Sequence, residues 1–416
     1  MPATTAVIIG AGQAGLAMSR CLSESGVEHV VFDRGRVAER WRAQSWDSLR
    51  LLTPNWMTRL PGFQYTGTDP DGFMSVPDLV TFLERYATSS RAPVIPETTV
   101  VRVEQRNDGF RVTTSLGTWR ARAVVIATGY CDLPVVPTFA CRLPPSVAQI
   151  VPSGYRRPAQ LPPGNVLIVG ASSTGVQLAD EIRRSGREVV IAAGRHTRLP
   201  RSYRGRDILW WLDRIGALSQ HRDAVHAIDI SRHQPSLQLV GTPEHRSLDL
   251  GILREAGVRV VGRVRHIEGR YAWLSDDLMA STAAADIKLA EILARVDRFI
   301  DPTGVAASSA EPFRPTWPIA SGAAIGTERL DLSAERIGAV IWATGYRRTY
   351  PWLHVPVLDS RGEIVHRDGV TPAAGLYVLG LQFQRCRNSS FIDGVGADAR
   401  FIAERIVGAA RRASAA

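Results

Sequence analysis

The chain has 416 residues, of which 45% are apolar and 22% charged, a composition typical of a globular protein long enough for two or three domains. The first apolar run begins at Val7 without a preceding basic segment, and no run approaches about 18 apolar residues, so we expect a cytoplasmic protein without a secretory signal or a membrane span. The formal charge of +10 comes from arginines spread along the chain, with Lys288 as the only lysine, which argues against a nucleic-acid-binding face.

A first nucleotide-binding unit is predicted over residues 7–33, where an apolar run, a glycine-rich turn and a helical pattern follow one another. The run is β-branched, as is typical of a strand buried on both faces of a parallel sheet. The glycines permit a sharp bend, the close approach of a phosphate and tight packing of helix on strand, and the helix N-terminus then binds the pyrophosphate. The predicted cofactor-binding residues of this turn are Gly10, Gly12, Gln13, Ala14 and Gly15.

The same pattern recurs from Leu167 without a gap, so that Gly10 matches Gly170 and Gly15 matches Gly175. A single motif of this kind is a weak signal. Here it is duplicated, and each copy follows a predicted strand and opens a predicted helix, which favours two bound dinucleotides over two empty turns. The predicted cofactor-binding residues of the second turn are Gly170, Ser172, Ser173, Thr174 and Gly175.

The two units differ at the end of their second strand. Asp33 stands where a carboxylate would accept hydrogen bonds from an adenosine ribose, whereas the matching residue of the second unit is Ala193. Arg195 and His196 follow Ala193, with two more arginines close behind, and a 2′-phosphate suits such a cationic segment. We therefore expect FAD at the first unit and NADPH at the second. The two further arginines are Arg198 and Arg201.

Residues 34–63 are polar and aromatic and lack helical periodicity. Trp41 and Trp46 could plug a loop or form walls of a flavin pocket, and we favour the second interpretation because the segment directly leaves the first unit. Arg34 and Arg42 could face a phosphate, or each could be solvated.

Three further elements are predicted before residue 131. Residues 76–86 form a helix with proline and aspartate in its first turn. Residues 99–116 alternate polar and apolar positions about an Asn-Asp-Gly turn, which predicts a hairpin. The apolar run over 123–130 returns the chain to the parallel sheet.

The sequence Ala-Thr-Gly-Tyr ends two apolar runs, at 127–130 and at 343–346. A strand that ends in Thr-Gly exposes backbone at the carboxyl edge of the sheet, where ligands of such folds bind. Each copy therefore marks a nucleotide edge and a crossing between domains, unless it is only a repeated strand-to-turn junction. The residues concerned are Thr128, Gly129, Thr344 and Gly345.

The middle of the chain carries fewer signals. The proline-rich segment 134–163 is typical of a linker, and residues 207–216 predict an amphipathic helix. From there to about residue 330 we recognise helical patterns at 247–256 and 284–296 and a strand at 258–264, but no chemical motif.

The histidines and cysteines show no metal-binding spacing, and we expect no metal site. No CxxC pair is present, although flavoproteins that reduce disulfides need two close cysteines. We interpret the histidines of the middle region as surface or core residues. The cysteines are Cys21, Cys131, Cys141 and Cys386, and those histidines are His221, His226, His233, His245 and His266.

The end of the chain predicts a strand over 375–382 and a long terminal helix. Gly394 lies in the polar loop just ahead of that helix. A helix N-terminus there could stabilise the negative charge of a reduced flavin, or the helix could simply be capped.

With these motifs in place, the sequence resembles the flavin-containing monooxygenases, most closely their soluble bacterial relatives. The resemblance is carried by residues 10–15, 40–54, 127–130, 170–175 and 343–348 and by the arginines from Arg195 onward. It implies an α/β protein with two Rossmann-type dinucleotide-binding domains, in which an FAD domain built from 1–160 and 336–416 encloses an NADPH domain with a helical insert at 161–335.

The resemblance also implies the chemistry. NADPH reduces FAD, dioxygen forms a flavin hydroperoxide, and one oxygen atom passes to a nitrogen or sulfur nucleophile of a small molecule. The expected partners are this substrate and O2, and a homodimer is compatible with the resemblance. Val101 is added to the cofactor-binding residues, and the substrate pocket is expected between the domains, with Gln382, Gln384 and Asn388 as candidates.

Two departures from the family pattern are visible. The family fingerprint before the second glycine motif has a histidine where this sequence aligns Val151, and only Tyr155 keeps its closing aromatic residue. Where family members often carry an asparagine near the reactive flavin carbon, this sequence aligns Leu52, with Asn55 nearby. The candidate catalytic residues are Leu52, Asn55 and Gln382.

Three alternative functions remain at this stage. The first is an NAD(P)H oxidase or reductase flavoprotein, the second a Baeyer-Villiger oxygenase, which the incomplete fingerprint disfavours, and the third a non-enzymatic redox sensor that binds both nucleotides.

Overall fold

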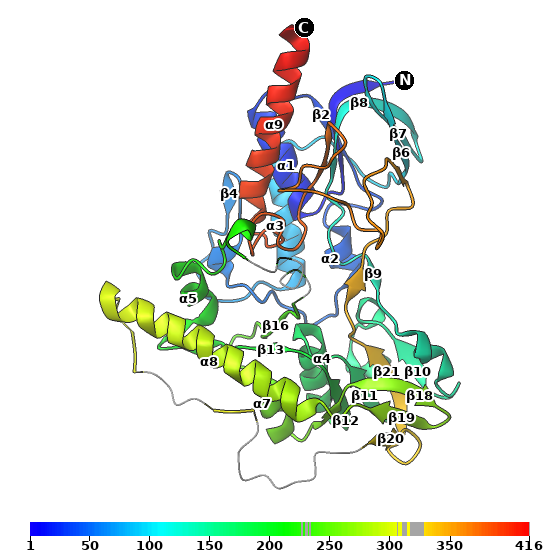
Figure 1. Cartoon of the computed structure of the whole chain (residues 1–416), viewed down its shortest axis with the longest axis vertical. Coiled ribbons are helices and arrows are strands. Elements are labelled where there is room, and N and C mark those ends of the chain that lie inside the picture. The colour runs from blue at the N-terminus through cyan, green and yellow to red at the C-terminus, as the bar shows by residue number, and fades with distance from the viewer. Residues whose placement is uncertain are drawn as a thin grey trace.

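The structure is a computed structural model that describes residues 1–225, 228, 232, 234–305, 307–309, 314–316 and 328–415. Figure 1 shows two lobes: both termini lie in one lobe, and the middle of the chain builds the other. We call them the first lobe and the second lobe. Each lobe is organised around one sheet that contains one of the two glycine-rich units.

The first lobe contains a sheet of eight strands in the order β23-β6-β7-β8-β1-β2-β5, with β24 also paired to β8. The strands β8, β1, β2 and β5 are parallel, whereas β6 and β7 form an antiparallel hairpin that returns to β8. Their bounds are β1 Ala3–Ile9, β2 His29–Phe32, β5 Val94–Ile95, β6 Val100–Arg106, β7 Gly109–Thr114, β8 Gly117–Ile126, β23 Leu353–His354 and β24 Leu376–Val378.

Three helices cover this sheet around one buried apolar cluster. The helix α1 (Gln13–Glu24) packs directly on the C-terminal helix α9 (Val395–Ala415), and both lie beside α3 (Val76–Ser89) in Figure 1. The side chain of Ser75 caps α3 by accepting a hydrogen bond from the amide of Asp78 at 3.3 Å. The core of the first lobe therefore joins the two ends of the chain.

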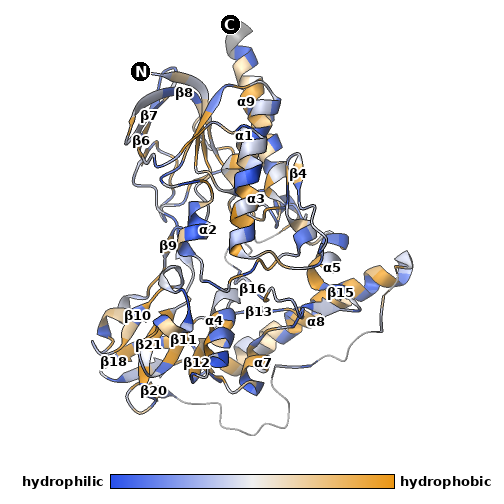
Figure 2. Cartoon of the chain, turned by 180° about the vertical axis from the view of Figure 1, so that it is seen from behind, coloured by the Kyte–Doolittle hydropathy of each residue, from blue (hydrophilic) through white to orange (hydrophobic). Residues whose placement is uncertain are grey.

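The second lobe contains an all-parallel sheet of five strands in the order β10-β21-β11-β12-β17. Helices α4 and α7 pack on it, and a three-stranded antiparallel sheet, β18-β19-β20, follows β17. In Figure 2 the strands β11 and β21 are predominantly in the apolar colour, as expected of strands buried on both faces, whereas the edge strand β10 is only partly buried. The bounds are β10 Ala148–Ile150, β11 Asn165–Val169, α4 Ser173–Arg184, β12 Val189–Ala193, α7 Leu250–Glu255, β17 Arg259–Gly262, β18 Val264–Glu268, β19 Tyr271–Leu274, β20 Arg329–Asp331 and β21 Ile337–Trp342.

The strand pairing differs from the predicted domain boundaries at both ends of the middle domain. The predicted first part, 1–160, includes β10, and the predicted last part, 336–416, includes β21, yet both strands belong to the second sheet. The reason is the duplication itself: β21 pairs in parallel with β11 just as β8 pairs in parallel with β1. The chain thus leaves the first lobe after β8 and returns to it after β21, in each case through an Ala-Thr-Gly-Tyr segment.

The two crossing segments meet between the lobes. The short strands β9 (Leu133–Pro134) and β22 (Tyr346–Arg347) form an antiparallel pair. The amide of Val135 donates to the carbonyl oxygen of Gly345 at 2.9 Å, and the hydroxyl of Thr344 donates to the carbonyl oxygen of Val135. The segment 134–163, expected to be a linker, is therefore partly ordered into this pair and into β10.

A long helix lies within the predicted insert. The helix α8 runs over Leu278–Thr303, where the sequence predicted only 284–296, and α5 (Ile208–Arg214) confirms the predicted helix at 207–216. Figure 2 shows α8 banded in polar and apolar colours, which fits its one-sided burial. The remaining elements are α2 Glu39–Gln44, η1 Asn55–Met57, β3 Arg59–Leu60, β4 Phe63–Gln64, η2 Thr138–Arg142, η3 Pro152–Gly154, η4 Pro158–Gln160, β13 Thr197–Arg198, β14 Ser202–Tyr203, β15 Arg206–Asp207, η5 Arg222–Ala224 and β16 Leu237–Gln238.

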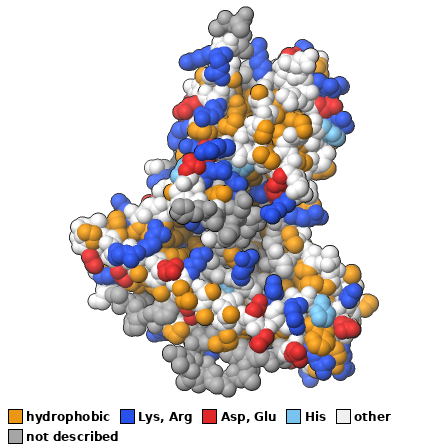
Figure 3. Space-filling view, viewed as in Figure 1, with side chains coloured by type: hydrophobic (Ala, Val, Ile, Leu, Met, Phe, Trp, Pro, Cys, Tyr) orange, Lys and Arg blue, Asp and Glu red, His pale blue; other side chains and the backbone are white. Residues whose placement is uncertain are grey.

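Two further predictions concern the spread of the arginines and the absence of a membrane-spanning helix. On the face shown in Figure 3, arginine side chains occur on both lobes among apolar and acidic ones, in keeping with their spread along the sequence. Within the described residues, none of the helices combines the length and apolar character needed to span a bilayer. The predictions for His226 and His233 fall outside the described residues.

Candidate functional site

The two glycine-rich turns have the same geometry. A Cβ atom added at Gly15 would lie 1.8 Å from the carbonyl oxygen of Gly10, and one added at Gly175 would lie 1.9 Å from that of Gly170. Gly10 and Gly170 share a φ of +110°, which L side chains rarely adopt. Only glycine fits these four positions, as the sequence predicted from the helix-to-strand packing.

The duplicated Ala-Thr-Gly-Tyr segments touch these turns directly. A Cβ atom at Gly10 would lie 2.5 Å from the carbonyl oxygen of Ala127, and one at Gly170 would lie 2.2 Å from that of Ala343. Each segment therefore borders the first glycine of its own unit, at the carboxyl edge of its sheet.

Neither helix that follows a turn is capped by the side chain of its own N-cap residue. Gly12 is the N-cap of α1 and Ser172 that of α4, and neither N-cap side chain bonds to a helix amide. No atom lies within 4 Å of a Cβ atom placed on Gly12, so the space before α1 is open to a ligand. Free amides at a helix N-terminus beside open space are what a pyrophosphate requires, so the first turn fits a dinucleotide. The second turn lines the cavity described below, and there the amide of Ser173 donates to the hydroxyl oxygen of Ser236 at 3.3 Å. Gln13 and Ala14 open α1, and Ser173 and Thr174 open α4.

Asp33 lies at the mouth of the first turn. Its carboxylate accepts hydrogen bonds from the amides of Ala11 at 2.6 Å and Gly35 at 2.9 Å. Each carboxylate oxygen can accept more than one hydrogen bond, so ribose hydroxyls can still donate to the same group. Asp33 therefore holds the turn, and its role in binding a ribose stays a prediction.

The predicted cationic residues of the segment after β12 differ in their exposure. Arg195 is exposed and lines the cavity described below. His196 is buried, its Nδ1 lies 2.9 Å from the carbonyl oxygen of Gly194, and burial lowers its pKa below the usual value. Among the described residues, its Nε2 has no hydrogen-bond partner. Arg195 therefore remains the one predicted cation of this segment that faces the cavity.

The other two arginines of that segment do not face a phosphate. Arg198 is buried and lies 3.1 Å from Asp286 and 3.6 Å from Asp249. Arg201 is fully buried and pairs with Asp207 at 2.6 Å. Because buried cations need such partners, both side chains are engaged in the core, which corrects their place among the phosphate-facing residues.

A cation that the sequence did not single out completes this edge. Arg263, just after β17, lines the same cavity as Arg195, and its side-chain carbons lie 3.5–3.8 Å from a Cβ atom added at Gly194. β17 is the strand next to β12, so its carboxyl end falls at the same edge. Only the sheet order could have revealed this neighbour, since Arg263 lies far from Arg195 in the sequence.

One large cavity, about 1190 Å³, lies between the lobes. Its walls include the second glycine turn and Arg195 from the second lobe, and Leu52, Tyr130 and Gln382 from the first. The second Ala-Thr-Gly-Tyr segment and one face of α8 complete it. A space bordered by the carboxyl edges of two dinucleotide-binding sheets can bring the reactive ends of two cofactors together.

Only some of the candidate catalytic residues line this cavity. Leu52 and Gln382 line it, but Asn55 does not. The buried Asn55 side chain donates from Nδ2 to the carbonyl oxygen of Asp69 at 2.8 Å and so fixes the 69–72 turn. Of the other pocket candidates, Gln384 is fully buried and accepts from the amide of Leu381 at 3.4 Å.

The predicted flavin-wall residues lie in different places. Trp41 packs against the core of the first lobe, whereas Trp46 is buried in the apolar cluster of the second lobe, together with Tyr155. Trp46 therefore anchors the segment 34–63 to the other lobe, and its prediction as a flavin wall is not supported. Val151, which stands where the family fingerprint has a histidine, packs beside a second apolar cluster of that lobe. This position therefore contributes to packing.

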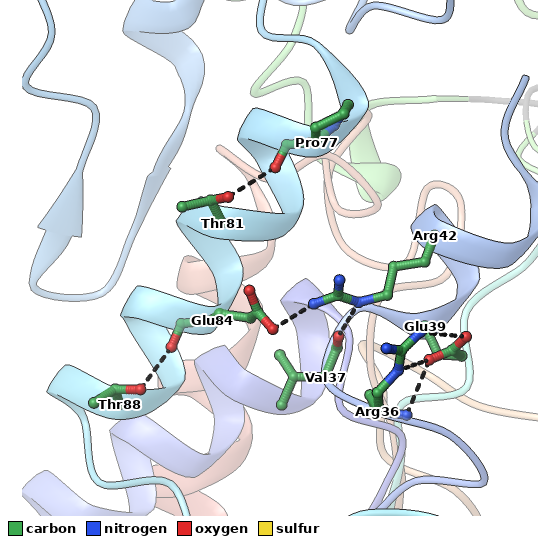
Figure 4. A network of polar contacts seen from close by, with 8 residues as sticks. All are labelled: Arg36, Val37, Glu39, Arg42, Pro77, Thr81, Glu84 and Thr88. Atoms are coloured by element: carbon green, nitrogen blue, oxygen red, sulfur yellow. Dashed lines mark hydrogen bonds and ion pairs between the residues drawn. The ribbon is translucent and has the colours of Figure 1, made fainter. Parts of the chain in front are cut away.

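The two arginines predicted near the phosphate also differ. Figure 4 shows the Arg42 guanidinium between Glu84 of α3, with which it forms an ion pair, and the carbonyl oxygen of Val37, to which Nε donates at 3.4 Å. Arg42 is thus engaged in joining α2 to α3, which corrects its phosphate role. Arg34 is largely exposed, with a guanidinium nitrogen 3.8 Å from Asp132.

Four remaining predicted residues lie around the first lobe. Val101 lies in β6 with half of its surface exposed, and Thr128 is exposed beside Gly129. Gly394 immediately precedes α9, and a Cβ atom there would lie 2.0 Å from the carbonyl oxygen of Asn388, so the glycine is required by packing.

The first turn of α9 contains a buried acid. The side chain of Asp398 is 2% exposed and lies 3.5 Å from Arg385, and burial raises its pKa to about 6, an effect that Ser389 and Arg385 oppose. This group did not stand out in the sequence, because its burial depends on the contact of α9 with the loop before it.

All four cysteines are free, and no group of three or more metal-binding side chains lies together within the described part of the chain.

The comparisons with known proteins agree with this geometry. A model of the pyridine nucleotide-disulphide oxidoreductase family matches residues 7–233, and the chain belongs to that family. An uncharacterised CzcO-like oxidoreductase of Geobacillus kaustophilus is 31% identical over 96% of the chain and 97% of its own length. The chain is therefore an enzyme, an oxidoreductase.

Two further similarities concern monooxygenases. The flavin-containing monooxygenase of Stenotrophomonas maltophilia has the same fold, with a TM-score of 0.67 over 99% of this chain and 100% of that one at 19% identity. The probable indole-3-pyruvate monooxygenase YUCCA1 of Arabidopsis thaliana is 30% identical over 48% of the chain and 49% of its own length. The predicted likeness to flavin-containing monooxygenases is confirmed, and the family supports FAD and NADPH as the cofactor pair.

Proposed function

We propose that the protein is an NADPH-dependent FAD monooxygenase that inserts one oxygen atom of O2 into a nitrogen or sulfur centre of a small molecule. The observation that carries this proposal is the cavity of about 1190 Å³ that the edge of the second nucleotide unit shares with Leu52, Tyr130 and Gln382 of the first lobe. The flavin supplies the oxygen activation when bound.

The residues of the chain have four tasks in this proposal. The amides of the first turn and the carboxylate of Asp33 bind FAD, and the second turn with Arg195 and Arg263 binds NADPH. Leu52 and the neighbouring apolar residues exclude water from the space between the nucleotides. Gln382 offers an amide that can orient the substrate. No acid–base pair is required of the protein.

The experiment is a product assay. FAD-loaded protein is supplied with NADPH under air and with a panel of amines, sulfides and ketones, and products are identified by mass spectrometry. We expect an N-oxide or sulfoxide formed in proportion to the NADPH consumed. NADPH oxidation that yields only hydrogen peroxide for every compound would contradict the proposal.

An NAD(P)H oxidase or reductase is the second candidate, and one observation favours it. The amide of Asn55, expected near the reactive flavin carbon, is hydrogen-bonded to Asp69 and does not line the cavity. An enzyme without that amide could pass electrons to oxygen without transferring an oxygen atom. The same assay separates the two functions, because an oxidase or reductase forms no oxygenated product.

A further inference from the structure

Three cations gather on one wall of the cavity. Lys288 and Arg295 lie two turns apart on α8 and both line the cavity. Arg387 joins them from the loop that precedes α9 in the first lobe. The wall is therefore built from both lobes, and two of its three cations come from the insert in which the sequence shows no chemical motif.

The contacts of these cations are with neutral groups. The guanidinium of Arg387 donates to Oε1 of Gln220 at 3.0 Å and to Oε1 of Gln234 at 3.5 Å, and it lies 5.0 Å from the ring centre of Phe383. The ammonium of Lys288 lies 3.4 Å from the hydroxyl oxygen of Thr197.

No carboxylate neutralises this wall among the described residues. Ion pairs to Asp or Glu are absent there for Lys288, Arg295 and Arg387, although other cations of the cavity have them. Asp286, two residues before Lys288, pairs with Arg198 and does not line the cavity, whereas Glu291, one turn after Lys288, does. Three cations thus face one acid.

The electrostatic consequence is visible in two side chains. Burial lowers the pKa of Lys288, and the positive charge of Arg387 lowers it further, against the effect of Glu291. Burial and the charge of Arg295 lower the pKa of Arg387. Cations that are held together without an anion repel one another, and a bound anion would relieve that repulsion.

We propose that the substrate of this enzyme carries a carboxylate, which Arg387 binds together with Lys288 and Arg295. The inference rests on the proposed function and names the substrate class of the same cavity. A planar guanidinium that is held by two glutamines and stacked on an aromatic ring can offer two parallel donors to a carboxylate.

The position of Arg387 favours the substrate over the cofactor phosphates. Arg387 stacks on Phe383, which follows Gln382 on the first lobe. The phosphates of a nucleotide in the second lobe have their own binding groups, the amides of the second turn, with Arg195 at the end of β12. Arg387 therefore lies toward the part of the cavity that a substrate would occupy, while Lys288 contacts Thr197, two residues after Arg195.

The test compares two probes that differ in one group. Binding of (phenylthio)acetate and of 2-(phenylthio)ethanol to FAD-loaded protein with NADP+ is measured by titration calorimetry. We expect the acid to bind ~10-fold or more tightly than the alcohol, as a charge-assisted hydrogen bond requires. Equal affinity for the two probes, or no binding of either, overturns the inference.

Substitutions locate the effect. Arg387→Gln should weaken binding of the acid by ~10- to 100-fold and leave the alcohol unchanged. Arg295→Gln should have the same direction with a smaller effect, because Arg295 is exposed. The control is Arg298→Gln, which removes an exposed arginine of the same helix that does not line the cavity. FAD content and thermal unfolding show whether each variant is folded.

Two outcomes separate this inference from neighbouring explanations. Weaker NADP+ binding in Arg387→Gln with an unchanged preference for the acid would assign the cations to a cofactor phosphate and overturn the inference. With NADPH and O2 added, oxygenation of both probes at equal kcat/KM would overturn it while the proposed function stands. Preferential binding of the acid without any oxygenated product would support it and contradict the proposed function.

Discussion

At the scale of single residues, the two units differ most clearly at one matched pair, Asp33 and Ala193. Asp33 accepts two backbone hydrogen bonds at the mouth of the first turn, whereas Ala193 is fully buried at the end of β12. We propose that the carboxylate binds ribose hydroxyls and that the neighbouring arginine of the second unit, where a methyl group replaces the carboxylate, selects a phosphate.

Asp33→Ser should reduce FAD binding by ~10-fold or more, because hydrogen bonds to a charged acceptor are lost. The flavin-to-protein absorbance ratio of the purified variant and a titration with added FAD measure the effect. Asp71→Ser, at an exposed position, is the matched control. An unchanged FAD affinity in Asp33→Ser would remove this carboxylate from the binding site.

Arg195→Gln should raise the KM for NADPH by ~10- to 100-fold and leave that for NADH nearly unchanged, because only NADPH carries a 2′-phosphate. Steady-state oxidation of both nucleotides measures the ratio. Arg263→Gln should act in the same direction, whereas Arg265→Gln, an exposed arginine that does not line the cavity, should have no effect. Equal losses for the two nucleotides in Arg195→Gln would contradict the assignment.

At the scale of elements, the turns and the first turn of α9 connect packing to function. Gly15 is required because the helix approaches the strand, and Gly12 faces open space. These two glycines of one motif therefore have separable roles, one in stability and one in ligand binding.

Gly15→Ala should destabilise the fold by about 2–4 kcal/mol, because its Cβ atom would overlap the Gly10 carbonyl and displace α1. Gly12→Ala should leave the thermal midpoint of the FAD-free protein nearly unchanged but weaken FAD, because a methyl group enters the phosphate space. Thermal unfolding and FAD titration of both variants provide the comparison. A loss of stability in Gly12→Ala as large as in Gly15→Ala would show that both act through packing.

The buried acid of α9 predicts a pH dependence. The fold raises the pKa of Asp398 from 3.8 to about 6, so the native state retains a proton that the unfolded chain has lost. Stability due to this group therefore falls as the pH rises from about 4 to about 6, and the penalty, at most about 3 kcal/mol, persists at higher pH.

Asp398→Asn should remove this penalty, so its thermal midpoint relative to the unmodified protein should rise as the pH increases from 4 to 7. Calorimetric scans at both pH values measure the difference, and Asp393→Asn, whose carboxylate pairs with Arg59 nearby, is the control. A difference that is independent of pH would mean that the ion pair to Arg385 dominates.

At the scale of the whole molecule, the lobes are joined by side chains that no local pattern predicts. Arg201 of the second lobe donates to the carbonyl oxygen of Leu52 in the first lobe at 2.9 Å and stacks on Phe73. A Cβ atom at Gly241 would lie 2.1 Å from the carbonyl oxygen of Leu51. The cavity wall at Leu52 is therefore held by the opposite lobe.

These contacts show what the sequence could and could not predict. The glycine turns, Asp33, the hairpin and α3 follow from local rules of backbone conformation and periodicity, and each was predicted in place. Trp46 and Arg42 were placed at the flavin, but their partners come from distant segments, Tyr155 and Glu84. The cation wall was also missed, because it needs α8 and the loop before α9 to meet.

The central claim is that the two nucleotide units serve one oxygen-transfer reaction in the cavity between the lobes. The most direct measurement is the mass of the product formed from a thioether or amine by FAD-loaded protein with NADPH under 18O2. The account predicts one labelled oxygen atom in each product molecule and none when the label is supplied in water. Products without the label, or NADPH consumption with hydrogen peroxide as the sole product, would contradict it.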